Sequence, residues 1–196
     1  MSHPPILLAS SSPGRIASLK KIGVAFKTHN PDIDETPLAN EGAVDLVKRL
    51  SIAKANTWMD DNDIVIAGDQ VLEVDGTILS KPHTMDNAYL QLKQCSGKTV
   101  YSYSGMCVTH QASGYINYTL TTAKAVYRQL TDTDIERYLH IDNPLQCAGS
   151  IKFESKGFVL LESLACNDSF AICGLPLHQL VSDLTELGRP LVQLID

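Results

Sequence analysis

The run Ile64-Val65-Ile66-Ala67-Gly68 constrains the fold of this chain more than any other sequence feature. A short unbroken stretch of apolar residues rich in β-branched side chains is typical of a strand buried in a sheet. We expect the strand to end at Asp69, where the apolar run stops. Helix signals lie before it and hairpin signals lie after it, so we predict a mixed α/β fold.

Local signals around this strand predict the other elements. Ser12 and Pro13 mark the start of a helix that Gly23 ends, because Ser is a frequent N-cap and Pro a frequent first helical residue. Asp75-Gly76 predicts a hairpin between short strands at 71–74 and 77–79. The remaining expected strands are 6–9, 24–29, 99–110, 115–127 and 158–164, and the expected helices are 42–58, 84–95, 131–141 and 176–188.

The order of these elements predicts a mixed central sheet flanked by helices, with two lobes and a cleft. The length of 196 residues fits one domain, residues 1–196.

The formal net charge of −6 argues against binding of long nucleic acid, which needs a basic surface. We find no apolar run of about 20 residues, as a membrane span would need, and no signal-peptide pattern. The five cysteines form no Cys-x-x-Cys pair, so we expect reduced thiols and a cytoplasmic location.

The segment Ser10-x-Ser12-Pro13-x-Arg15 is the first candidate for chemistry. A strand that runs into a helix N-terminus gathers unpaired N–H groups and a partial positive charge, which suits a phosphate. The hydroxyls of Ser10 and Ser12 and the guanidinium of Arg15 add further donors. The alternative is an ordinary Ser-Pro helix start without a ligand.

Acidic residues at two places could serve a cation. Asp69 follows the buried strand, and open α/β sheets bind ligands beyond the carboxyl ends of their strands. A buried carboxylate needs a metal ion or a lysine as partner. The alternative for Asp69 is a turn cap. Asp34-Glu35 lies in a loop before the long helix, where carboxylates commonly just favour the helix dipole.

Two lysines complete the set of candidates. Lys54 falls on the same apolar helix face as Val47 and Leu50, and Lys81 stands just before Pro82. Either lysine could instead extend to solvent along its apolar stem. With Arg15 they supply three cations for a polyphosphate, and the two acidic segments supply carboxylates for Mg²⁺ or Mn²⁺.

These segments together resemble the Maf family, and the resemblance covers nearly the whole chain. The family pattern Leu-Ala-Ser-x-Ser-Pro-x-Arg is similar to residues 8–15, and Asp-Glu-Thr is similar to residues 34–36. Arg-Leu followed after three residues by Lys-Ala matches residues 49–55. A strand ending in Asp and a hairpin ending in Lys-Pro match Asp69 and Lys81-Pro82. The later matches are Ala148-Gly149 and Gly174-Leu175-Pro176-Leu177.

The resemblance implies a Maf/ITPase-like fold and hydrolysis of nucleoside triphosphates between the α- and β-phosphates, with a divalent metal. It implies that Asp69 is the general base and that Glu35 is its metal-binding companion. Ser10, Arg15, Lys54 and Lys81 resemble the groups that handle the phosphates. It also suggests a homodimer.

Three positions bear on the substrate. Many Maf proteins have Arg, Thr and Gln where this chain has Gly14, Gln70 and Glu154. Gln70 and Glu154 resemble the branch that prefers 7-methyl-GTP, whereas Gly14 fits neither branch. A carboxylate at Glu154 can accept both N–H donors of the guanine edge, and the positive charge of a 7-methylated ring favours it further. The alternative is a solvated Glu154 paired with Lys152 or Lys156.

Two other functions stay open at this point. One is the sister branch that acts on dTTP or UTP. The other is a nucleotide-binding regulator of cell division without turnover, because the family name is tied to cell-division arrest.

Overall fold

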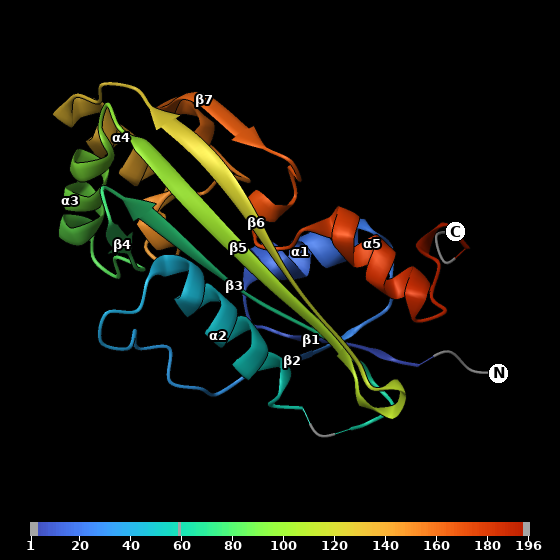
Figure 1. Cartoon of the computed structure of the whole chain (residues 1–196). Coiled ribbons are helices and arrows are strands. Elements are labelled where there is room, and N and C mark those ends of the chain that lie inside the picture. The colour runs from blue at the N-terminus through green and yellow to red at the C-terminus, as the bar shows by residue number, and fades with distance from the viewer. Residues whose placement is uncertain (1–3, 59, 194–196) are drawn as a thin grey trace. The chain divides into compact units, whose positions relative to one another are not determined.

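The computed structural model describes residues 4–58 and 60–193 (Figure 1). Within these ranges the chain forms five α-helices, which are α1 (Pro13–Lys21), α2 (Ala43–Ala55), α3 (Met85–Cys95), α4 (Asp132–Asp142) and α5 (Leu177–Glu186). The strands are β1 (Ile6–Ala9), β2 (Lys27–His29), β3 (Ile64–Val74), β4 (Thr77–Leu79), β5 (Thr99–His110), β6 (Tyr115–Tyr127) and β7 (Leu161–Cys166).

These seven described strands form one mixed sheet, in the order β2-β1-β3-β5-β6-β7, and β4 pairs with β3. The predicted mixed α/β fold is therefore confirmed. None of the helices in the described part of the chain is both long enough and apolar enough to cross a bilayer.

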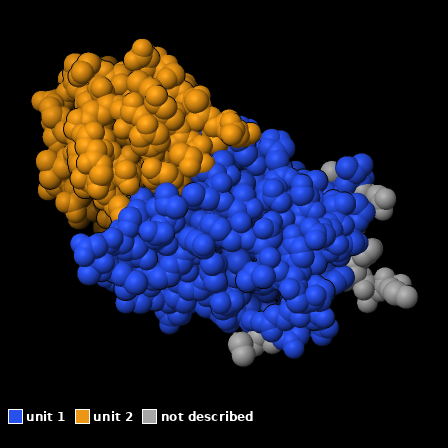
Figure 2. Space-filling model, viewed as in Figure 1, with its two compact units in different colours: residues 1–69, 104–121, 168–196 blue, residues 70–103, 122–167 orange. Residues whose placement is uncertain are grey.

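The chain divides into two compact units, as Figure 2 shows. Unit 1 comprises residues 1–69, 104–121 and 168–196, and unit 2 comprises residues 70–103 and 122–167. The strands β3, β5 and β6 each have residues in both units. Two units agree with the expected two lobes, and the assignment of the whole chain to a single domain stays a prediction.

In unit 1, β1 and the first five residues of β3 are buried at every position, and these residues are apolar throughout. β1 pairs in parallel with β2 and with β3. Leu7 and Val65 belong to a core cluster with Ala55 of α2, whereas Leu8 and Ile66 pack with residues of α1 and α5. Alternate side chains of one strand point to opposite faces, so a single run supplies both cores.

In unit 2, one core joins the strands to α3 and α4. Leu72, Leu92, Tyr127 and Ile135 are members of this cluster. The predicted hairpin is present, with β3 and β4 antiparallel around Asp75-Gly76. Both turn residues have positive φ, 49° at Asp75 and 76° at Gly76, which the tight two-residue turn requires.

Some predicted boundaries were wrong. β3 does not end at Asp69 but runs through it to Val74, so the expected strand at 71–74 is part of β3. β2 contains only residues 27–29, since only these three pair with β1. The strand expected at 158–164 begins at Leu161, because its partner Tyr127 is the last residue of β6. The helix expected to reach residue 58 ends at Ala55.

Candidate functional site

Lys54, Asp69 and Glu35 meet at one point in unit 1. Lys54 Nζ lies 2.5 Å from Asp69 Oδ1 and 2.7 Å from Glu35 Oε1. The side chains of Lys54 and Asp69 are 6% and 11% exposed, whereas that of Glu35 is 50% exposed. The structure therefore brings together the two acidic segments that the sequence singled out, around a buried ammonium group.

Helix α2 places Lys54 there. Val47 and Leu50 lie on the same helix face and are buried, as the spacing predicts. Lys54 on this face is therefore buried, and its ammonium group forms ion pairs with Glu35 and Asp69. The alternative that Lys54 extends to solvent is wrong.

Ser51 is a contributor that sequence reasoning missed. It is fully buried one turn before Lys54, and its Oγ accepts the backbone N–H of Asp69 at 3.0 Å. This hydrogen bond joins α2 to β3 at Asp69. The sequence could have indicated Ser51, because its spacing places it on the same face of α2 as Val47 and Lys54.

Glycines let α2 and the sheet approach closely here. A Cβ at Gly105 would lie 2.5 Å from Val47 and 2.7 Å from Ser51 Oγ. A Cβ at Gly68 would lie 2.6 Å from the Gly105 carbonyl oxygen. Side chains at either position would push α2 or β5 away from Asp69.

Ser10 and Arg15 form the second part of the site, also in unit 1. Ser10 Oγ accepts from Arg15 Nη1 and from the backbone N–H of Ser12, both at 3.1 Å. Arg15 Nε donates to the Gly174 carbonyl at 3.2 Å. Because Ser10 Oγ already accepts two hydrogen bonds, its own O–H is the group left to donate to a ligand.

Arg15 lies within electrostatic range of the carboxylates. Burial lowers the pKa of Arg15, and the negative charges of Asp69 and Glu35 oppose this shift. Ser12 is the N-cap residue of α1 but makes no side-chain cap bond. Gly14 lies in the first turn of α1, where a Cβ would lie 3.0 Å from the Cys173 carbonyl oxygen. This close approach is a physical reason for glycine at a position that departs from the family pattern.

The other predicted site residues belong to unit 2. Gln70 Nε2 donates to Ser102 Oγ at 3.0 Å. Lys81 and Glu154 are exposed, and their charges both act on the pKa of Cys147, which burial raises. Both residues therefore lie around Cys147.

The loop that carries Glu154 is tied to Asp142, a second residue that the sequence did not reveal. Asp142 Oδ1 accepts from Ser155 Oγ at 2.6 Å, and Oδ2 accepts from the backbone N–H of Lys156 at 3.2 Å. Lys152 Nζ donates to the Asp142 carbonyl oxygen at 2.6 Å. The exposure of Glu154 agrees with the solvated side chain of the alternative. No ion pair between described residues joins Glu154 to Lys152 or Lys156, so the pairing is not supported.

Comparison with known proteins gives the same result as the motifs. A family model described as Maf-like protein matches residues 5–187. The chain belongs to the Maf family.

Relatives within the family are similar over nearly their whole length. A 7-methyl-GTP pyrophosphatase of Hydrogenovibrio crunogenus is 43% identical, covering 93% of this chain and 92% of the relative. A 7-methyl-GTP pyrophosphatase of Pseudomonas aeruginosa is 40% identical, covering 94% and 97%. A nucleoside triphosphate pyrophosphatase of Acinetobacter baylyi is 40% identical, covering 93% and 95%.

The donor set of this Maf protein fits a hard divalent cation that is shared with a phosphate ligand. The described residues contain no group of three or more His, Cys, Asp or Glu placed for a metal. However, one carboxylate oxygen of Glu35 and one of Asp69 both contact the same atom, Lys54 Nζ. Mg²⁺ typically takes one or two carboxylates and completes its shell with water and phosphate oxygens.

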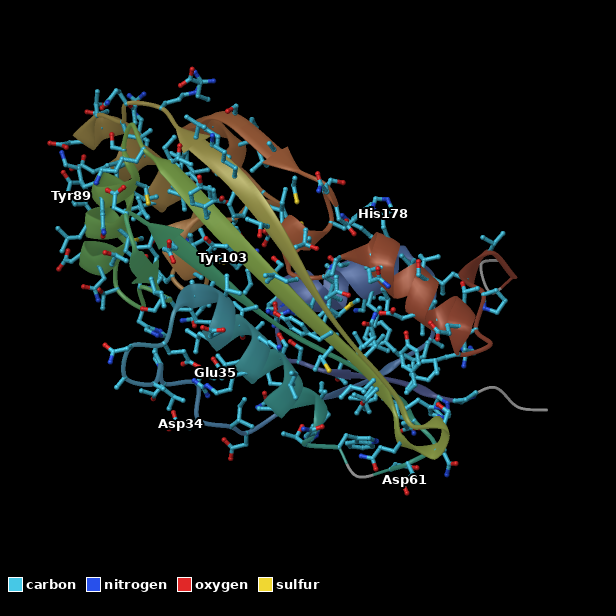
Figure 3. All side chains as sticks on the ribbon, viewed as in Figure 1. Asp34, Glu35, Asp61, Tyr89, Tyr103 and His178 are labelled. Carbon is cyan, nitrogen blue, oxygen red and sulfur yellow. The ribbon has the colours of Figure 1, made fainter. Side chains whose placement is uncertain are left out.

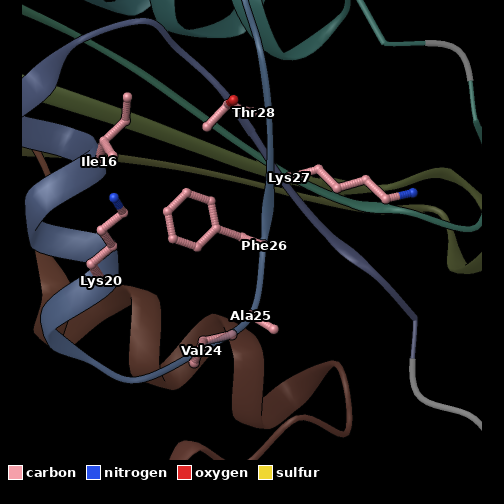
Figure 4. Close-up of a pocket in the computed structure, with 7 residues that line it drawn as sticks. All are labelled: Ile16, Lys20, Val24, Ala25, Phe26, Lys27 and Thr28. Atoms are coloured by element: carbon pink, nitrogen blue, oxygen red, sulfur yellow. The ribbon is translucent and has the colours of Figure 1, made fainter.

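Another hollow of the Maf chain has different chemistry. It has a volume of about 690 Å³ and is shown in Figure 4. It shares no residue with the Lys54 cluster and contains no carboxylate, so it does not take part in the candidate site. Its lining residues are Ile16, Lys20, Val24, Ala25, Phe26, Lys27 and Thr28.

Proposed function

We propose that this chain hydrolyses 7-methyl-GTP to 7-methyl-GMP and pyrophosphate. The observation that carries the proposal is the meeting of Lys54, Asp69 and Glu35 beside Arg15 and Ser10. Pyrophosphatase activity is supported by the names of relatives about 40% identical to the chain. The 7-methyl-GTP preference rests on two of those names and on Gln70 and Glu154.

Asp69 is the proposed general base. Its carboxylate takes a proton from the water that attacks the α-phosphorus, and the bond from this phosphorus to the bridging oxygen breaks. The electron pair leaves with pyrophosphate. Asp69 is held for this task by Lys54 at its side chain and by Ser51 at its backbone. Fixed orientation of this kind supplies much of the rate in hydrolytic enzymes.

Cationic groups neutralise the phosphates. Lys54 has three N–H donors, and its contacts with Asp69 and Glu35 use two of them. The third is left for a phosphate oxygen. Arg15 adds a second cation, and Ser10 adds an O–H donor. Lys81 is proposed as a further phosphate ligand from its place in the family motif.

Glu35 and Asp69 are the proposed ligands of Mg²⁺ or Mn²⁺. When bound, the cation would neutralise phosphate charge and polarise the α-phosphoryl group. The half-exposed Glu35 carboxylate can leave Lys54 for a cation with little rearrangement, because it lies in a loop.

Glu154 is the proposed reader of the methylated base, with Gln70 and Gly14 as further specificity positions. The loop of Glu154 is fastened by Asp142, so its carboxylate is presented on a defined backbone. A cytoplasmic location and a homodimer are also predictions.

The deciding experiment measures pyrophosphate release from 7-methyl-GTP, GTP, dTTP and UTP, with Mg²⁺, Mn²⁺ or chelator. We expect the highest kcat/KM with 7-methyl-GTP and loss of turnover with chelator. Asp69→Asn should keep its fold and lose about 10²–10⁴-fold of the turnover, the usual contribution of a general base. Full activity of a folded Asp69→Asn protein would remove Asp69 from the mechanism.

The same assay separates the alternatives. Higher kcat/KM with dTTP or UTP would place the chain in the sister branch. Tight nucleotide binding without pyrophosphate release would support a regulator without turnover and refute the proposal.

A further inference from the structure

Glu35 lies on a segment without regular secondary structure. Residues 30–42 contain no helix or strand, and the Glu35 side chain is half exposed. Packing alone therefore does not fix this carboxylate beside Lys54. Figure 3 labels Asp34 and Glu35 on this segment.

Arg49 of α2 makes three hydrogen bonds to the segment. Its Nε and Nη2 donate to the two carboxylate oxygens of Glu41 at 2.7 and 2.8 Å. Nη2 also donates to the backbone carbonyl of Thr36 at 3.0 Å. A two-point contact between Arg and a carboxylate fixes orientation as well as distance.

Two hydrogen bonds within the segment hold the backbone near Glu35 and Glu41. Asp34 Oδ1 accepts the N–H of Thr36 at 2.9 Å, which closes a turn around Glu35. Glu41 Oε2 accepts the N–H of Leu38, also at 2.9 Å. The residues before and after Glu35 are thus joined to each other and, through Thr36, to Arg49.

Arg49 and Lys54 lie on the same rigid helix. They are five positions apart, which is about 7.5 Å along a helix axis. Helix α2 therefore holds the segment at Thr36 and Glu41 through Arg49, and meets Glu35 through Lys54. The electrostatic influence of Asp69 also reaches Arg49.

We propose that Arg49 is the positioning residue that holds Glu35 at the carboxylate cluster. This inference rests on the proposed function, in which Glu35 takes part. It adds a residue that supports the reaction without touching the substrate or the reacting atoms. Without Arg49 the segment loses three hydrogen bonds to α2, and Glu35 reaches Lys54 and Asp69 in a fraction of conformations. Activity that depends on Glu35 then falls to that fraction of the wild-type value.

The kinetic test is a double-mutant cycle of Arg49→Gln and Glu35→Gln. We expect Arg49→Gln to lower kcat about 10-fold or more with a KM change below about 3-fold, as loss of positioning does. In the Glu35→Gln background the same change should cost less than about 2-fold, because both act through one group. Equal fold-losses in both backgrounds, or unchanged kcat in Arg49→Gln, would overturn the inference.

Arg49→Lys is the conservative variant. Lysine keeps the charge but not the two-point geometry, so its kcat should lie between those of wild type and Arg49→Gln. Arg137→Gln, an exposed change on α4, is the matched control and should leave kcat and the cycle unaffected.

Hydrogen exchange supplies a readout that does not depend on turnover. In Arg49→Gln and Arg49→Lys the amides of Thr36 and Leu38 should exchange faster, while those of β3 keep wild-type protection. Unchanged exchange at Thr36 and Leu38 would refute the role of Arg49. If wild type released no pyrophosphate, the proposed function would fail, and exchange would still decide whether Arg49 holds the segment.

Discussion

Lys54 and Asp69 form a buried ion pair with 2.5 Å between Nζ and Oδ1. Their side chains are 6% and 11% exposed, so both charges are stabilised by neighbouring charged groups more than by water. This pair links the stability of unit 1 to its proposed chemistry.

Lys54→Met should therefore lower both the free energy of unfolding and the rate of pyrophosphate release. Asp69 would keep a buried negative charge without its nearest cation, which costs on the order of 3 kcal/mol in the free energy of unfolding. Pyrophosphate release should fall with it. The double variant with Asp69→Asn should lose less stability than the sum of the single variants. Urea unfolding measures these values, and strict additivity would contradict the pairing.

Ser10→Ala should weaken the phosphate side of the site. It removes the acceptor of two N–H groups, those of Arg15 and Ser12, at a cost of about 1–3 kcal/mol in stability. We also expect the KM for the nucleotide to rise about 10-fold, which corresponds to about 1.4 kcal/mol of binding free energy. Ser11→Ala is the matched control, because Ser11 is exposed in the same segment. Equal effects at both serines would argue against a specific role for Ser10.

The destabilisation caused by a side chain at Gly68 or Gly14 should follow the closeness of the contact at each position. A Cβ at Gly68 would lie 2.6 Å from a backbone oxygen, and one at Gly14 would lie 3.0 Å from another. Gly68→Ala should cost about 3 kcal/mol and Gly14→Ala about 1 kcal/mol in thermal or urea unfolding. The reverse order would mean that the chain near Cys173 cannot adjust.

Glu154→Gln should change the base preference without unfolding the loop. Asp142 still binds Ser155 and Lys156, so the backbone stays in place. The ratio of kcat/KM for 7-methyl-GTP over UTP should fall about 10- to 100-fold, as expected when one paired group at a specificity contact is lost. Glu162→Gln, an exposed change on β7, should leave the ratio unaltered. A constant ratio in Glu154→Gln would assign base selection to other residues.

Acid should weaken the hold of Arg49 on Glu41. The hydrogen bonds from Arg49 and from the Leu38 backbone lower the pKa of Glu41 from 4.5 to about 2. A lowered pKa means that the carboxylate stabilises the fold above pH 4.5 and loses this effect as the pH falls to about 2. Glu41→Gln should therefore be less stable than wild type near neutral pH, and the difference should shrink through this window. Urea unfolding over a pH series tests this, and a difference independent of pH would contradict it.

The sequence alone determined most of the elements and the candidate residues. Strands 99–110 and 115–127 match β5 and β6 at both ends, and the Asp75-Gly76 turn was placed correctly. These features depend on alternation and turn chemistry within a few residues, which a sequence displays directly. The motifs likewise singled out Ser10, Arg15, Glu35, Lys54 and Asp69.

Only the tertiary structure decided how these residues meet. Asp69-Gln70 interrupts the apolar run, so local pattern predicts two strands, whereas pairing with neighbouring strands keeps β3 continuous. Lysines usually extend to solvent, and only the packing of α2 on the sheet shows that Lys54 is buried. The hydrogen bonds from Asp69 to Ser51 and from Arg49 to Thr36 join residues that are 18 and 13 positions apart. Such contacts depend on the packing of whole elements, which no local spacing contains.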